Sequence, residues 1–289
     1  MPTKQDLSKR KVGPWLAATL TDWGLIVVSM AFAIQVRNIF VTFLAILIIG
    51  SRIHALSILG HDGAHRLISS NRKLNDFLTN FFCFWPMGIC LDAYRYFHFK
   101  HHRLVGTNQD PELPARALER PDWDVPTTKE ALLKQVIRDL FGFNVRFVYV
   151  LIKTINPKSC VKTSQILKPY FLQGSLILMI IFCGYYEALL LWIVSLSTSF
   201  VAVFRLRGWF EHIGTKSTHR LEMPWWLAWF VAPHNTWYHW EHHEYSYVPF
   251  WRLKEARKWD RQIPVADLKT ILKLYKTSPA VPSGEQMAA

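Results

Sequence analysis

Nine of the twelve histidines in this 289-residue chain gather at four places in the sequence. Three places are tight clusters and the fourth is a single residue, and together they comprise His61, His65, His98, His101, His102, His212, His239, His242 and His243. Residues three or four apart share a helix face, so each cluster can direct two or three imidazoles at one point. Since imidazole is the commonest metal ligand among side chains, the pattern predicts a metal centre.

Long apolar stretches before and between the clusters must position them. The chain is 51% apolar and 15% aromatic. A membrane-spanning helix needs about 20 mostly apolar residues. Four stretches meet or nearly meet this length, at 14–34, 38–59, 169–186 and 187–205. We therefore expect an all-α membrane protein with about four transmembrane helices.

Three shorter apolar runs are expected to be re-entrant or interfacial segments. Pro86 and Gly88 interrupt the first of them, and proline breaks a helix. The runs are 77–91, 141–152 and 223–233.

Basic residues near the first span predict the orientation. Lys4, Lys9, Arg10 and Lys11 precede it, and positive residues favour the cytoplasmic side. With four spans, all nine clustered histidines then lie on that same side. No cleavage site for a signal peptide is evident, and a bacterial inner membrane is the expected location.

The formal net charge of +13 has two interpretations. Basic segments orient membrane proteins and attract anionic lipids, or they dock an acidic redox partner. No nucleic-acid-binding motif accompanies them. The cysteines lack CxxC spacing and are expected to be free thiols rather than metal ligands; they are Cys83, Cys90, Cys160 and Cys183.

Nine imidazoles are too many for one structural zinc ion, so two metal ions are the natural count. Imidazole suits iron, copper, zinc and nickel, and the ligands alone leave the metal open.

The segments HDGAH at 61–65, HFKHH at 98–102 and HWEHH at 239–243 resemble the histidine boxes of the membrane fatty acid desaturase and hydroxylase superfamily. The resemblance covers about residues 40 to 255 and includes the two spans between the second and third boxes. It implies two iron ions held by the nine histidines, with O2 as co-substrate. It also implies a four-helix stem whose cytoplasmic helical cap holds the metals.

The same resemblance extends to other residues. RGWFEH at 207–212 is similar to the segment that supplies His212 as a further ligand, and it places Glu211 beside the metals. Asn235 occupies a position from which asparagine reaches a metal through water. Asp110 can orient a ligand imidazole as an acceptor. The closing segment 242–253 resembles carotenoid ketolases and some bacterial acyl desaturases.

The function implied is a desaturase of lipid metabolism that acts on an acyl chain. The alternatives are a hydroxylase or ketolase acting on a carotenoid or other amphiphilic substrate, and, from another class, a metal transport or storage protein. Transport sites are expected near the bilayer midplane, whereas these histidines lie beyond the helix ends. No electron-transfer motif is present in the sequence, so a separate ferredoxin or cytochrome b5 type donor is expected.

Two polar residues of the second span are candidates for substrate binding. Arg52 is costly in lipid, and it could hold an anionic head group, pair with Asp92 or extend to the interface. His54 lies seven residues before His61, on the same helix face, and could line a substrate pocket or bond within the bundle. We expect one domain over residues 1–275 and a disordered tail over 276–289.

Overall fold

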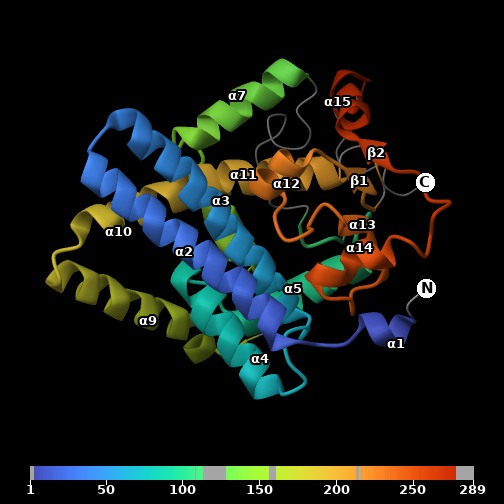
Figure 1. The fold of residues 1–289 in the computed structure, drawn as a ribbon, viewed down its shortest axis with the longest axis horizontal. Helices are drawn as coiled ribbons and strands as arrows, with labels where there is room; N and C mark the ends of the chain where they lie inside the picture. The colour runs from blue at the N-terminus through green and yellow to red at the C-terminus, as the bar shows by residue number, and fades with distance from the viewer. Residues whose placement is uncertain are drawn as a thin grey trace.

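The computed structural model describes residues 3–107, 109–112, 128–155, 161–212, 215 and 217–277. Cys160 and residues 278–289 of the expected tail lie outside these ranges; the last described helix extends through Thr277. Helices form nearly all of the regular structure (Figure 1). Within the described residues, four helical segments are long and apolar enough to cross a membrane. The predicted all-α membrane fold with four spans is confirmed.

The four spans form a stem of two helical hairpins. The first joins α2 (Val12–Val36) to α3 (Ile39–Ala64). Arg37 closes α2 in the left-handed conformation, and the Asn38 side chain accepts hydrogen bonds from the backbone N–H groups of Phe40 and Val41 to start α3. This side-chain cap begins the second helix directly after the first, so the two pack antiparallel.

The second hairpin joins α9 (Thr163–Phe182) to α10 (Tyr186–Ser197), and α11 (Ser199–His212) continues from α10. Gly184 supplies the positive φ of 79° that the turn requires. Thr198 interrupts the last span with φ −121° and ψ −85°. The fourth predicted span is therefore two helices in sequence rather than one.

The apolar run at 77–91 does not span the membrane. It is divided among α4 (Arg72–Thr79), the π-helical turn η1 (Asn80–Phe84) and the 3₁₀ turn η2 (Trp85–Met87). Gly88 ends the segment with φ 72°. These breaks match the interruption predicted from the proline and glycine of this run.

Short helices at one end of the stem form the cap. Its elements are α1 (Lys4–Leu7), α5 (Leu91–Leu104), α12 (Trp225–Val231), α13 (His239–Glu244), η3 (Phe250–Arg252), α14 (Leu253–Ala256) and α15 (Leu268–Thr277). Two further helices, α7 (Lys129–Leu140) and α8 (Val145–Ile155), join the cap to the side of the fourth span. One pair of two-residue parallel strands, β1 (Leu221–Glu222) and β2 (Ala266–Asp267), joins the C-terminal segment to the cap.

Two glycines allow α3 to pack closely at its cap end. A Cβ atom on Gly60 would overlap the ring of Phe84, and one on Gly63 would overlap the side chain of Thr79. Gly63 lies within the first histidine box, so the glycine there has a packing reason, since overpacking a tight contact is destabilising.

Candidate metal centre

Four helices carry the clustered histidines to one place. His61 lies in the last turn of α3 and His65 caps that helix. The second cluster lies on α5, the third on α13, and His212 is the last residue of α11. Because α3 and α11 both end at the cap, the two spans deliver their terminal histidines to the same depth as the two short helices.

The first group joins five histidines, whose ring nitrogens all lie within 4.8 Å of one another: His61, His65, His98, His102 and His242. The Nε2 atom of His98 is 2.8 Å from that of His65 and 2.9 Å from that of His102. The Nε2 atoms of His102 and His242 are 3.0 Å apart. Three separate helices thus aim their imidazoles at one point.

The remaining four histidines form the second group. Ring nitrogens of His101, His239 and His243 lie within 4.8 Å of one another. His212 meets His239 in a set with Glu211, and meets His101 in a set with Glu112. The His102 and His243 rings stack with centroids 4.3 Å apart, which places the two groups side by side.

The nitrogen contacts fit metal ligation better than hydrogen bonding among the imidazoles. His98 and His102 each direct one Nε2 atom at two other Nε2 atoms, whereas one ring nitrogen offers a single proton or a single lone pair. Two nitrogens bound at right angles to one metal, each about 2.1 Å from it, lie about 3.0 Å apart. The residues present therefore fit two adjacent metal ions.

Burial keeps these imidazoles in the form that binds metal. Desolvation, together with the neighbouring His101, lowers the pKa of His102 to about 4. Burial also lowers the pKa of His98, His239 and His242 well below the usual value. Neutral imidazole has the free lone pair that coordination needs.

Asp110 lies where it can orient a histidine of the second group. Its Oδ1 atom is 2.9 Å from Nδ1 of His101, and both side chains are buried. The carboxylate also accepts a hydrogen bond from the backbone N–H of Glu112. Accepting the Nδ1 proton leaves Nε2 of His101 free to face the group.

Replacing Asp110 with asparagine is expected to weaken metal retention and turnover about 10- to 100-fold, because the amide does not favour the same histidine tautomer. Metal per chain after dialysis against a graded chelator series, and product formed per minute, measure the effect. Asp92→Asn, a matched change at an exposed carboxylate of α5, the helix that carries His101, is the control. Equal metal retention in the two variants would contradict the orienting role.

Glu211 and Asn235 have different environments. The carboxylate of Glu211 is fully buried, with Oε2 3.0 Å from Nε of Arg207 and 3.6 Å from Nε2 of His239. Asn235 adopts φ 60° in the turn before α13. Its Nδ2 group donates to the backbone oxygen of Phe250 at 2.9 Å. Glu211 thus adjoins the second group, while the Asn235 amide ties the turn to η3.

Arg52 is engaged in an ion pair within the stem. Its Nη1 atom is 3.2 Å from Oδ1 of Asp22, and its guanidinium stacks over Trp229 at 4.0 Å. The expected alternative partner, Asp92, bonds Arg95 instead. Of the three alternatives for Arg52, the pairing with Asp92 is therefore wrong, because helix packing brings α2, rather than α5, beside this part of α3.

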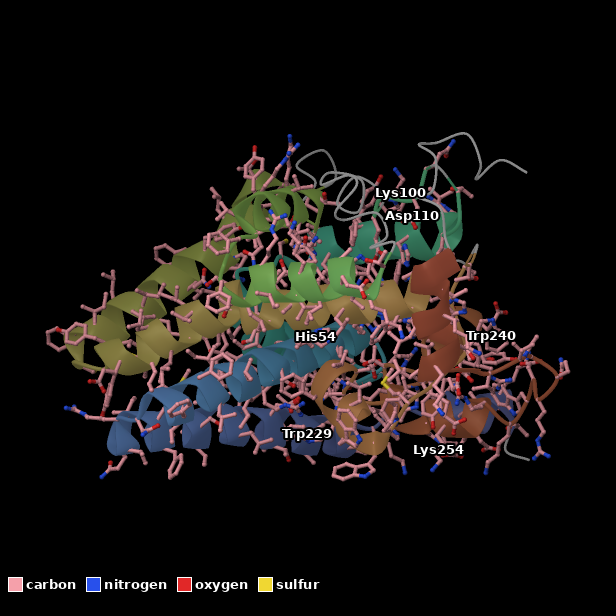
Figure 2. All side chains as sticks on the ribbon, turned by 90° about the horizontal axis from the view of Figure 1, so that it is seen from above. His54, Lys100, Asp110, Trp229, Trp240 and Lys254 are labelled. Atoms are coloured by element: carbon pink, nitrogen blue, oxygen red, sulfur yellow. The ribbon has the colours of Figure 1, made fainter. Side chains whose placement is uncertain are left out.

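His54 is fully buried among the stem helices (Figure 2). It packs against the rings of Phe200 and Phe204, and its Nδ1 atom is 3.4 Å from Oγ of Ser57. Neither His54 nor Arg52 is among the described residues that line the cavity beside the histidines.

The histidine boxes also contain two buried carboxylates that the histidine spacing does not predict. Asp62 accepts a hydrogen bond from the backbone N–H of Phe250 at 3.0 Å. Glu241 accepts from Nε of both Arg220 and Arg257, each at 2.7 Å. Each is next to a clustered histidine in the sequence but lies on another face of its helix, so an acidic residue within a histidine box is the sequence signal for them. They anchor the helices that carry the imidazoles.

A cavity of about 220 Å³ adjoins the histidines. His61, His98, His101, His212 and His239 contribute to its wall. The rest is mostly apolar, comes chiefly from α5, α8 and α11 with smaller contributions from α3, α10, η1 and η2, and includes Phe84, Phe97, Leu151, Phe200 and Phe204. Arg207 and Glu211 add charge at the histidine end. The arrangement can hold an apolar group against the metal-binding residues.

Comparison with known proteins agrees with this architecture. The model of the fatty acid desaturase family matches residues 37–272. A dihydrorhizobitoxine desaturase from Bradyrhizobium elkanii is 28% identical over 242 residues, which cover 76% of this chain and 68% of that protein. The family match includes every histidine box and all but the first of the spans. The chain therefore belongs to the fatty acid desaturase family, and it is a desaturase-type membrane oxidoreductase.

Proposed function

We propose that the protein is an oxygen-dependent di-iron desaturase that acts on an acyl chain. The observation that carries this proposal is the apolar cavity whose wall includes five of the nine histidines. An alkyl group in that cavity would lie directly against the residues that bind metal. The family membership supports the reaction type.

The first group of five histidines would hold one iron ion, and the second group of four, with Glu211 adjoining it, would hold the other. Bound iron would supply the reduction of dioxygen that permits hydrogen removal from an unactivated C–H bond. The chain itself supplies neutral imidazoles, a cavity wall that excludes water, and Asp110 as the acceptor that fixes the His101 ring.

The outcome of oxidation depends on where the substrate carbons lie relative to the histidine groups. Loss of a second hydrogen from the adjacent carbon gives a double bond, while oxygen insertion gives an alcohol. The relative from Bradyrhizobium elkanii is named as a desaturase of dihydrorhizobitoxine, which favours the double bond here. Hydroxylation or ketolation of another amphiphile is the competing outcome of the test below.

Electrons would come from a separate protein of the ferredoxin or cytochrome b5 type. The proposed orientation has the N-terminus and the cap in the cytoplasm of a bacterial inner membrane. Support comes from the chain's formal net charge of +13, since basic surfaces attract acidic partners. Exposed lysines and arginines of the cap, such as Arg103 and Lys254, are candidates for the docking contacts.

The test is a mass profile of lipids, carotenoids and small metabolites from cells that express the protein with a ferredoxin system, compared with cells expressing His242→Ala. A product two mass units lighter than its acyl precursor, present only with the unaltered protein, is the expected result. A product heavier than its precursor by one oxygen atom would instead identify the reaction as hydroxylation. The proposal would be overturned if the unaltered protein retains two irons per chain and the two mass profiles are nevertheless identical with every electron donor tried.

Narrowing the cavity is expected to impair the reaction without loss of metal. Leu151 of α8 lines the cavity and belongs to neither histidine group. Leu151→Trp should lower product formation at least about 10-fold, because its added volume occupies substrate space. Iron content per chain should stay at the unaltered value. Leu133→Trp, at an exposed position of α7, is the control; equal activity in the two variants would show that the substrate lies elsewhere.

A further inference from the structure

The helices α7 and α8 meet at an elbow that lies deep beside the fourth span. The Nδ2 group of Asn144 donates to the backbone oxygen of Ser197 at 3.0 Å and to that of Asp139 at 3.2 Å. Gly142, which also belongs to the elbow, faces the methyl group of Thr198. The elbow therefore lies at the break between α10 and α11, fourteen residues before His212.

Hydrogen bonds between the spans give the depth of this break. The Oγ atom of Ser199 donates to the backbone oxygen of Ile46 at 2.6 Å. Ile46 lies seven residues after Ile39, or about 10 Å along α3. The level of the elbow is therefore about 10 Å from the end of the stem where the exposed ion pair of Arg37 with Glu187 lies.

The depth of the elbow can also be compared with that of residues nearer the cap. Arg52 lies six residues after Ile46, or about 9 Å further along α3. Trp229 of α12 stacks on Arg52 and is 42% exposed, and exposed tryptophans mark the membrane interface. The elbow is thus deeper in the stem than this aromatic level. Figure 1 shows α7 running beside α11 and ending among the stem helices, away from α13 and α14.

The polarity of this helix pair is inverted relative to that of a water-soluble surface. The polar side chains nearest the elbow point inward: Gln135 and Asp139 are buried, and Asp139 pairs with Arg205 of α11 at 2.9 Å. Large apolar side chains point outward, with Phe143 at 69% and Val145 at 76% exposure. Outside water, polar groups must be satisfied within the protein, while apolar groups can face lipid.

We propose that α7 and α8 form a re-entrant hairpin, inserted into the hydrocarbon layer from the cap side, whose outer face contacts lipid acyl chains. Four exposed cations of the described hairpin must reach water or head groups. Lys129 and Lys153 lie toward the ends of α7 and α8 that are remote from the elbow. Lys134 lies eight residues before Gly142, about 12 Å nearer the cap, and Arg146 can extend its long side chain toward the boundary.

The inner face of α8 gives the insertion a functional consequence. Val148, Leu151, Ile152 and Ile155 line the cavity beside the histidines, so the hairpin separates that cavity from lipid. An apolar substrate dissolved in the bilayer could then enter beside α8 without crossing water. This consequence rests on the proposed function, whereas the insertion of the hairpin does not.

The test is collision access of a nitroxide attached at Phe143→Cys in protein reconstituted into phosphatidylcholine vesicles. The background carries alanine at all four native cysteines and must retain iron. Reference labels at Leu178→Cys, exposed on α9, and at Lys254→Cys, exposed in the cap, represent lipid and water. Val145→Cys repeats the measurement at a second outward position, should the first variant fold poorly.

The measured quantity is the ratio of accessibility to dissolved oxygen over accessibility to a water-soluble nickel complex. This ratio is expected to be at least about fivefold higher at the Phe143 label than at the Lys254 label, because oxygen concentrates in hydrocarbon and the nickel complex does not. A ratio like that of the Lys254 label would show that the elbow is in water. Exclusion of both reagents would show that protein covers this face. Either result overturns the insertion, and neither depends on whether the substrate or the reaction is assigned correctly.

Discussion

Replacing His242 with alanine is expected to lower iron from about two ions to about one per chain and to reduce product formation to background. The Nε2 atom of His242 lies 3.0 Å from that of His102, and both belong to the five-histidine group. In the proposed site, loss of this imidazole would remove one ligand nitrogen and open the group to water. Iron analysis and product formation from the same preparation measure the two effects.

His219→Ala is the matched control for this substitution. His219 follows α11 but belongs to none of the metal-binding sets among the described residues. Iron content and product formation should both match the unaltered protein. Membrane insertion of both variants is checked by detergent extraction and size-exclusion chromatography. Full activity of a well-folded His242→Ala protein would show that the ligand set is wrong.

Replacing Asp22 with alanine is expected to lower the free energy of unfolding by about 3–5 kcal/mol, because it leaves a buried cation without its partner. Asp22 is 1% exposed and accepts from both Arg52 and His234, at 3.2 Å and 2.6 Å. The residue thereby connects α2, α3 and the turn before α13. Thermal unfolding in detergent, followed by tryptophan fluorescence, measures the loss.

The double variant Asp22→Leu with Arg52→Met separates a structural role from a substrate-binding role. Apolar side chains of similar size in place of a buried ion pair often preserve stability, so most of the thermal stability should return. If Arg52 only stabilises the stem, the double variant has the same KM for the substrate as the unaltered protein. A raised KM with restored stability would instead support Arg52 as a substrate contact.

The histidine boxes show how far local spacing predicts a site. Intervals of three and four residues put imidazoles on one helix face regardless of the rest of the fold. All nine selected histidines lie in one of the two groups. The division into five and four was not predictable from the sequence, because His61 and His242 are 181 positions apart and only the packing of α3 against the cap brings them together.

The four spans and the histidine set were predictable from residue order, since both depend on composition and periodicity within one helix. Helix packing was needed to show which histidines share a group, that Arg52 pairs with Asp22, and that the α7–α8 elbow lies beside the middle of a span. Each of these depends on contacts between helices far apart in the chain. Spacing within one helix does not predict those contacts, because helix packing depends on side-chain complementarity over the whole stem.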